Sequence, residues 1–369
     1  MEKQQFVMRD TGIKGKALCV FEDKSVLIYI KGKFRVVSIK NKEIISEFYL
    51  PISNWKKISC KLRILERALH IEPRWAMPLE KSVLILWDSK IYRIDLKNGK
   101  YDVEKVSVKG KPLNISCIKD IKGFSNSLIV GDYHKNSKRE EVRLFWKKEN
   151  KQEWEIAYIF PNGKIRHIHN IIPDKKNNRV LIFSGDEDNE SGIWEAKDNF
   201  KVVRPLIIGK QQYRSCQGII LNEKMYYATD APSELNAIYY FDDKKGKHEK
   251  IVNLRGSCIY GCIYDDLWFF STTCEPKAHA KNYIDYWMSN VPGEGILDDK
   301  IDICLIDKMG EFYKIGTFRS DKLPLRLFQY ATAFFAYNDK IDSPILFTPI
   351  CVKKYDMHVF EIIDVQREG

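Results

Sequence analysis

The 369-residue sequence contains no run of 18 consecutive apolar residues. This absence excludes a membrane-spanning helix of ordinary length. The N-terminal stretch MEKQQFVMRDTG also lacks the apolar core of a signal peptide. We therefore expect a cytoplasmic protein that makes no contact with a membrane.

The nine cysteines are an odd number, and no two of them form a CxxC pair. Cys19, Cys117, Cys262 and Cys351 lie inside apolar runs. Cysteines in such surroundings are typical of buried free thiols, which persist in a reducing compartment.

Several motifs of well-known catalysts are missing. The sequence has no P-loop, no GxSxG, no HExxH, no EF-hand loop and no GxGxxG. These absences argue against nucleotide hydrolysis, serine hydrolysis and zinc proteolysis.

The net charge of +11 comes from 61 Lys and Arg residues against 50 Asp and Glu residues. The lysines are dispersed through turn-like segments such as 174–178 and 242–247. Nucleic-acid binding needs a clustered basic stripe, so we expect a solvated surface and no nucleic-acid partner. The overall positive field still favours an anionic ligand, such as an acidic sugar.

A repeated pattern dominates the chain. Seven short apolar runs each end in a small or polar residue, and their starts lie 42 to 78 residues apart. Each is followed by a loop and a further β-rich run, and most are preceded by another strand. The seven runs are SVLIYIKG (from Ser25), SVLILWDS (Ser82), SLIVGDY (Ser127), RVLIFSGD (Arg179), MYYATD (Met225), LWFFSTT (Leu267) and ILFTP (Ile345).

Repeated units of four short strands predict an all-β fold, a β-propeller. We expect residues 1–369 to form a single propeller domain of seven four-stranded blades, with an insertion around 277–295 that holds a possible short helix. Six blades are the alternative if one terminal unit is something else. A two-domain β-sandwich would require the spacing to be accidental.

The blade geometry predicts where polar residues gather. The start of a blade's first strand and the end of its second strand lie together, because an antiparallel pair brings its two open ends side by side. His167 and His169 enter a first strand, and Asp186 and Glu187 leave the second strand of the same blade. We therefore expect the histidines and the acidic cluster to meet at the mouth of the central channel.

Other blades contribute to the same predicted ring, with a smaller share (Lys31, His70 and Asp88) from blades one and two. We assign acid, base or nucleophile roles to His167, His169, Asp186, Glu275, Tyr133 and Tyr330. We assign ligand binding to Asp132, Asn136, Arg166, Glu187, Arg214, Gln217, Asp230, Asn236 and Gln329.

The predicted roles require no cofactor. A divalent metal at His167 and His169 is an alternative, with Asp186, Gln217 or Glu275 as further ligands. Structural roles are the other alternative: carboxylates at strand ends cap turns, and tyrosines pack between blades.

Seven stretches between about residues 60 and 335 carry a family resemblance. They are GDYHKN (131–136), IRHIHN (165–170), SGDEDNESGIW (184–194), GKQQYRS (209–215), ATDAPSELNAIY (228–239), STTCEP (271–276) and LFQYA (327–331). Through them the chain resembles the Asp-box (BNR-like, sialidase-type) propellers, in particular a branch that accompanies bacterial and archaeal polysaccharide genes. The Asp boxes are reduced: KKENKQEW keeps Trp154, and AKDNFKVV keeps Asp198. True sialidases have an arginine triad; in this sequence Arg166 and Arg214 correspond to two of its members, and there is no clear third.

The resemblance implies a carbohydrate context and leaves the reaction open. Our first hypothesis is a hydrolase or lyase that acts on an acidic oligo- or polysaccharide in an axial pocket. Asp186 and Glu275 would form the carboxylate pair of a hydrolase. In a lyase, a histidine and Tyr133 or Tyr330 would move the protons while Arg214 and Gln217 neutralise a uronate. The alternative is a non-catalytic propeller that binds a glycan or assembles proteins in a polysaccharide pathway.

Overall fold

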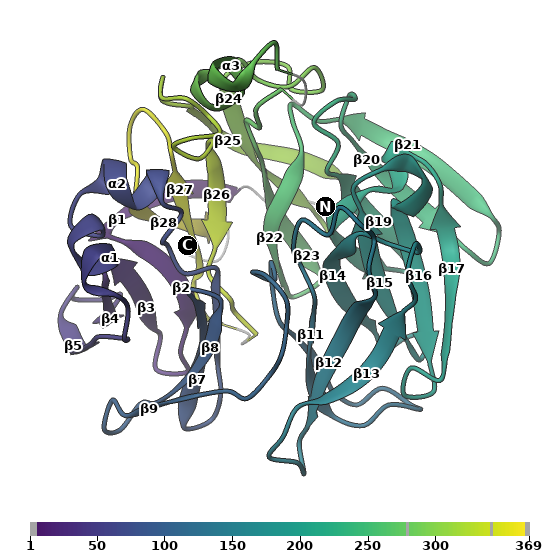
Figure 1. Ribbon diagram of the computed structural model, residues 1–369, viewed down its shortest axis with the longest axis horizontal. Helices are drawn as coiled ribbons and strands as arrows, with labels where there is room; N and C mark the ends of the chain where they lie inside the picture. Colours follow the sequence, from purple (N-terminus) through teal and green to yellow (C-terminus); the bar gives the residue numbers. More distant parts are fainter. Residues whose placement is uncertain (1–5, 278–279, 340–341, 366–369) are drawn as a thin grey trace.

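The computed structural model describes residues 6–277, 280–339 and 342–365, which form seven four-stranded antiparallel sheets. The sheets follow one another around a central axis in chain order, as Figure 1 shows. Neighbouring innermost strands contact each other around much of the ring, including at the junction of the last blade with the first. The fold is therefore a seven-bladed β-propeller, with the predicted number of blades.

Each blade runs from an inner to an outer strand. The first four blades are β2 (Lys16–Val20), β3 (Ser25–Ile30), β4 (Lys33–Ser38) and β5 (Ile44–Phe48); β6 (Trp75–Pro78), β7 (Ser82–Trp87), β8 (Lys90–Asp95) and β9 (Tyr101–Val103); β10 (Ser116–Ile118), β11 (Ser127–Gly131), β12 (Val142–Lys148) and β13 (Glu155–Phe160); and β14 (His167–Asp174), β15 (Arg179–Gly185), β16 (Gly192–Lys197) and β17 (Val202–Ile208). The last three are β18 (Ser215–Leu221), β19 (Lys224–Thr229), β20 (Ala237–Asp242) and β21 (Lys247–Asn253); β22 (Cys258–Tyr264), β23 (Leu267–Thr272), β24 (Lys300–Ile306) and β25 (Phe312–Arg319); and β26 (Thr332–Phe335), β27 (Ile345–Ile350), β28 (His358–Asp364) and β1 (Phe6–Lys14).

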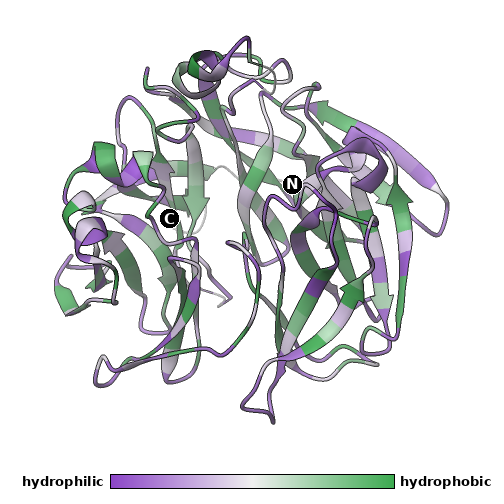
Figure 2. Cartoon of the chain, viewed as in Figure 1, coloured by the Kyte–Doolittle hydropathy of each residue, from purple (hydrophilic) through white to green (hydrophobic). Residues whose placement is uncertain are grey.

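The seven predicted apolar runs are the second strands of the seven blades. These strands are buried on both faces because each blade packs against a blade on either side, so their sequences are almost continuously apolar. The outermost strands are more exposed, as the exposed and partly exposed residues along β17 and β21 show. Figure 2 shows hydrophilic colours in many loops and along β21.

The ring closes through a strand from the other end of the chain. β1 pairs antiparallel with β28, with Phe6 opposite Asp364, and so forms the outer strand of the seventh blade. The spacing of the repeats does not reveal this pairing, because β1 precedes the first apolar run.

Three short helices lie outside the blades. α1 (Asn54–Ser59) and α2 (Arg63–Ala68) connect the first two blades, and they carry no helical period long enough to detect in the sequence. α3 (Tyr283–Met288) lies in the 273–299 segment between β23 and β24, where the insertion is expected; residues 278–279 of that expected insertion lie outside the described part of the chain. In the described ranges, no helix is long and apolar enough to cross a membrane.

All nine cysteines are free. The prediction that Cys117 is buried is wrong, because this thiol is exposed. Cys117 is the middle residue of the three-residue strand β10, so its side chain points away from the face that buries its neighbour Ile118. Cys262 is partly exposed, and Cys19 and Cys351 are buried as expected.

Candidate functional site

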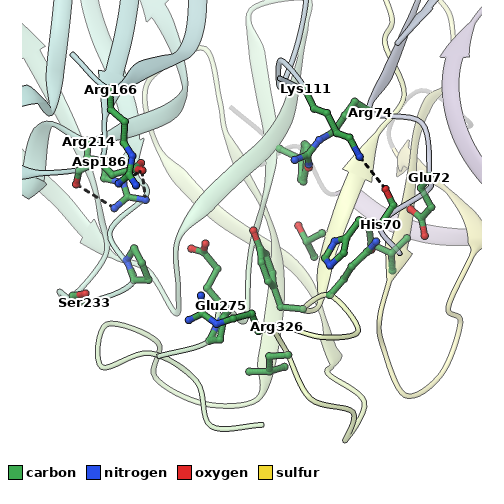
Figure 3. A pocket seen from close by; sticks show the side chains of 18 of the residues that line it. His70, Glu72, Arg74, Lys111, Arg166, Asp186, Arg214, Ser233, Glu275 and Arg326 are labelled. Atoms are coloured by element: carbon green, nitrogen blue, oxygen red, sulfur yellow. Dashed lines mark hydrogen bonds and ion pairs between the residues drawn. The ribbon is translucent and has the colours of Figure 1, made fainter. Parts of the chain in front are cut away.

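The central channel opens into a polar pocket of about 870 Å³ at the face where first strands begin and second strands end. Figure 3 shows side chains from several blades converging on it. Arg166, Asp186 and Arg214 lie on one side, and Arg74 and Lys111 lie on the other. The size is adequate for a small oligosaccharide or another drug-sized ligand.

The predicted meeting of the histidines with the acidic cluster takes place on the fourth blade. His167 pairs with Gly185 across β14 and β15, so Asp186 follows directly beside the start of β14. The Asp186 Oδ1 atom lies 3.2 Å from His169 Nε2 and 3.3 Å from His167 Nε2. The two Nε2 atoms are 3.0 Å apart.

A β-bulge determines the orientation of the His169 side chain. Ile168 pairs with Ser184 and Asn170 with Phe183, which leaves His169 as the extra residue on β14. Its Nδ1 lies 3.1 Å from the carbonyl oxygen of Ser215 on the next blade. The bulge therefore turns this ring toward the junction of two blades, and the ring is almost completely buried.

Gly185 makes room for the His169 ring. A Cβ atom on Gly185 would lie 2.6 Å from His169 Cε1 and 3.2 Å from Arg214 Cγ. These distances are shorter than van der Waals contact, so the close approach of the ring to β15 depends on the missing side chain.

Two arginines hold Asp186 from the pocket side. Arg166 Nη1 lies 3.1 Å from Asp186 Oδ2, and Arg214 Nη2 lies 3.2 Å from Oδ1. Burial opposes ionisation of Asp186, but the histidine rings and the Arg214 charge outweigh it and hold the pKa of this carboxyl well below its usual range. Burial lowers the pKa of His169 to about 4, so this ring is neutral at neutral pH.

Glu275 has the opposite electrostatic environment. It lines the pocket, and burial raises its pKa above the usual carboxyl range. Its Oε2 atom has no hydrogen-bond partner among the described residues. Asp186 and Glu275 are therefore two carboxyl groups on one pocket with their pKa values pushed apart.

A third carboxyl group lies behind the pocket wall. Burial raises the pKa of Asp230 to about 8, against the opposing charge of Arg214, whose Nε is 3.5 Å from Asp230 Oδ2. Cys216, at the bulge of β18, donates its thiol hydrogen to the same oxygen over 3.3 Å.

The predicted tyrosines occupy different positions. Tyr330 lines the pocket, whereas the Tyr133 ring packs on His167 with 4.3 Å between ring centroids. Burial raises the pKa of both phenols well above the usual value. Both therefore stay protonated at neutral pH, which makes them poor general bases.

The remaining predicted residues fall into two groups. Of the ligand-binding predictions, the structure places four on the pocket wall: Arg166, Glu187, Arg214 and Gln329. Of the other five, Asp230 lies behind the pocket wall against Arg214, and four hold the backbone. Asp132 accepts hydrogen bonds from Lys109 N and Arg143, and the side-chain amides of Asn136, Gln217 and Asn236 donate to backbone carbonyl groups. His167 and His169 lie behind Asp186 and do not line the pocket either.

Sequence reasoning missed a set of cationic pocket residues: Lys16, Arg74, Lys111 and Arg326. Lys16 begins β2, and Arg74 directly precedes β6. Both therefore lie at the start of a first strand, as Arg214 does, and this position in the sequence could have identified them. Lys111 and Arg326 come from loops between blades, for which the repeat gives no positional signal.

Comparison with known proteins supports the fold alone. No family model and no curated protein matches the sequence. Among solved structures, the AfRom2 CNH domain superposes with a TM-score of 0.54 at 6% identity, covering 98% of this chain and 96% of that one. The extracellular domain of the putative one-component system BT4673 from B. thetaiotaomicron gives a TM-score of 0.56 at 8% identity, covering 98% of this chain and 40% of that one. At these identities the shared feature is the β-propeller architecture.

Proposed function

We propose that the protein is a carbohydrate-active enzyme that cleaves an acidic oligo- or polysaccharide in the axial pocket. The observation that carries the proposal is that one cavity holds a half-buried carboxyl group with a raised pKa, Glu275, and three cationic side chains, Arg74, Lys111 and Arg326, without a carboxylate partner among the described residues. The resemblance to Asp-box propellers supports the carbohydrate context.

Three cationic side chains of the pocket can each bind an anionic group of a ligand. Arg74 donates to Tyr260 Oη, Lys111 to the carbonyl oxygen of His70 and Arg326 to the carbonyl oxygen of Lys277. Within the described ranges, none of these three cations forms an ion pair with a carboxylate. A carboxylate-bearing sugar would supply the missing counter-charge, and arginine binds such a group in a bidentate fashion.

Glu275 is suited to donate a proton. Cleavage of a glycosidic bond by hydrolysis or by elimination leaves an oxygen that must be protonated as the bond breaks. A carboxyl group with a raised pKa holds that proton to a higher pH than an ordinary carboxyl group does. Asp186 cannot do so, because its hydrogen bonds with the two histidine rings and the charge of Arg214 keep it ionised.

The direct test incubates the full chain with uronate-containing oligosaccharides of several linkages and with neutral oligosaccharides of matched length. New reducing ends report any cleavage, and ultraviolet absorbance of unsaturated uronates reports elimination. We expect products from at least one acidic oligosaccharide and none from the neutral set. Calorimetric binding of an acidic glycan without any product would favour the binding-only alternative, and neither binding nor products would refute the proposal.

Replacing Lys111 with Met should weaken binding of an acidic oligosaccharide by about 10- to 100-fold, because a charge-assisted contact contributes about 1.5–3 kcal/mol. Isothermal titration calorimetry measures the change. Lys57→Met is the matched control: it removes the same charge from an exposed position on α1 and should leave the affinity unchanged. Equal weakening in both variants would mean that net charge, and not the pocket, attracts the glycan.

A further inference from the structure

Three potential ligand atoms form a small triangle beside the pocket. They are His167 Nε2, His169 Nε2 and Asp186 Oδ1, and the three distances between them are 3.0, 3.2 and 3.3 Å. Three atoms that can each act as an acceptor come this close only when a hydrogen or a cation lies between them.

The backbone determines which ring nitrogens carry hydrogen. His167 Nδ1 lies 2.9 Å from the carbonyl oxygen of His134, and His169 Nδ1 lies 3.1 Å from that of Ser215. A carbonyl oxygen can only accept, so each Nδ1 donates. A neutral ring whose Nδ1 donates presents a lone pair at Nε2, so two neutral rings turn two lone pairs toward each other and toward a carboxylate oxygen. Such an arrangement is repulsive unless a cation or a shared proton lies between the three atoms.

We propose that His167, His169 and Asp186 bind a divalent transition-metal ion such as Zn²⁺. Two ligand atoms that each lie about 2 Å from a tetrahedral metal are about 3.3 Å apart. The observed triangle is close to that size, and an ion would sit about 1 Å out of its plane. This inference does not depend on the proposed function, since the three residues could hold an ion whether or not the pocket cleaves a glycan.

The surroundings match those of a metal site. Two imidazoles and one carboxylate suit zinc and the neighbouring transition metals better than Mg²⁺ or Ca²⁺. The hydrogen bonds from both Nδ1 atoms to carbonyl oxygens fix the rings in the orientation that ligation needs. The side chain of Asp186 is 22% exposed and those of the histidines are 6% and 1% exposed, so solvent reaches the ligands from the Asp186 side.

The arginines beside Asp186 lower the affinity that we expect for a metal ion. Arg166 and Arg214 compete with a cation for the same carboxylate. A single proton shared among the three atoms is the competing explanation, and it predicts that no metal binds.

The test uses the full chain after treatment with a chelator. Zn²⁺ titrated by calorimetry should bind with a stoichiometry of one per chain, and Co²⁺ should give the visible absorption bands of a low-symmetry nitrogen and oxygen site. His167→Gln, His169→Gln and Asp186→Asn should each weaken Zn²⁺ binding by at least about 100-fold. Gly185→Ala should weaken it by about 10-fold or more, because the added Cβ displaces the His169 ring.

Two control variants sharpen the result. His358→Gln removes a histidine that pairs with Asp10 between β28 and β1 of the seventh blade, and it should leave Zn²⁺ binding unchanged. Cys216→Ser should also leave Zn²⁺ binding unchanged, although Cys216 and Asp230 form a second potential ligand group with His169.

Near-ultraviolet circular dichroism identifies any variant that fails to fold. Asp186→Asn is the variant most certain to fold, because Asp186 is the most solvent-accessible of the three ligands. Absence of stoichiometric Zn²⁺ and Co²⁺ binding would overturn the proposal in favour of the shared proton. Loss of binding in Cys216→Ser with retention in Asp186→Asn would overturn it in favour of the second group.

Discussion

Glu275→Gln should reduce the rate of glycan cleavage by about 100- to 10,000-fold, the range that a positioned general acid contributes. Glutamine keeps the shape of the side chain but has no proton to donate to the departing oxygen. Affinity for the acidic oligosaccharide should change by less than about 3-fold, since a neutral acid and a neutral amide carry the same charge. Initial rates of reducing-end formation, together with calorimetric affinities, separate the two effects.

Glu234→Gln is the matched control. Glu234 also lines the pocket but is exposed, so the loss of its carboxyl group should leave the rate nearly unchanged. Similar rate losses in both variants would indicate that pocket charge matters in general and that Glu275 has no special role. Full activity of Glu275→Gln would refute its assignment as the acid.

The raised pKa of Glu275 also gives the pH dependence a definite sign. Because the acid form is the active one, cleavage should fall as the pH rises through that pKa, and the alkaline decline should be absent from the residual activity of Glu275→Gln. A raised pKa means that the folded protein holds the proton more tightly than the unfolded chain does. This contribution to stability is complete below the unfolded pKa and is lost as the pH rises through the folded pKa, so Glu275→Gln should gain stability relative to the native protein only at higher pH.

Arg179→Met should lower the free energy of unfolding by about 3–5 kcal/mol, because it leaves the buried carboxylate of Asp174 without its counter-charge. Arg179 Nε lies 2.7 Å from Asp174 Oδ2, and its Nη1 lies 3.2 Å from Glu195 Oε1 and 2.5 Å from Asp243 Oδ2. The side chains of Arg179, Asp174 and Glu195 are at most 4% exposed. The cluster joins three strands of the fourth blade to the loop after β20, so its loss should loosen the blade that carries His167 and Asp186.

Arg204→Met removes a partner of the same Glu195 from the surface. The Arg204 side chain is 63% exposed, so this variant should lose less than about 1 kcal/mol. Urea unfolding followed by tryptophan fluorescence compares the two variants at one pH. A small loss in Arg179→Met would show that the buried carboxylates accept protons or water at little cost.

The repeat could be recognised in the sequence because every blade needs a second strand that is buried on both faces. A second strand with neighbouring blades on both faces must be apolar along its whole length, and β15 and β27 show this clearly. Turns punctuate these strands at nearly regular intervals, so the number of blades could be predicted. The closing strand β1 could not, because its pairing with β28 joins opposite ends of the chain and most of its side chains are exposed or only partly buried.

The site was predictable to the extent that it follows from antiparallel pairing. The pairing of β14 with β15 brings His167 and His169 to Asp186, as expected from their positions at the open end of a hairpin. The same rule placed Asp132 at the mouth of the channel, where it accepts hydrogen bonds from Lys109 N and Arg143 N away from the pocket wall. Strand position alone does not say whether a polar side chain turns toward the pocket or toward the backbone.

The amino-acid sequence by itself determined the propeller, its seven blades and the end of the hairpins at which polar residues gather. These properties depend on local periodicity and on hairpin geometry, which short stretches of sequence contain. The tertiary structure decided that the His169 bulge points at the next blade and that Lys111 and Arg326 reach the pocket from loops. It also decided that the Oε2 atom of the half-buried Glu275 has no hydrogen-bond partner in the described part of the chain. These properties depend on burial and on contacts between blades, which arise only when distant segments pack around one axis.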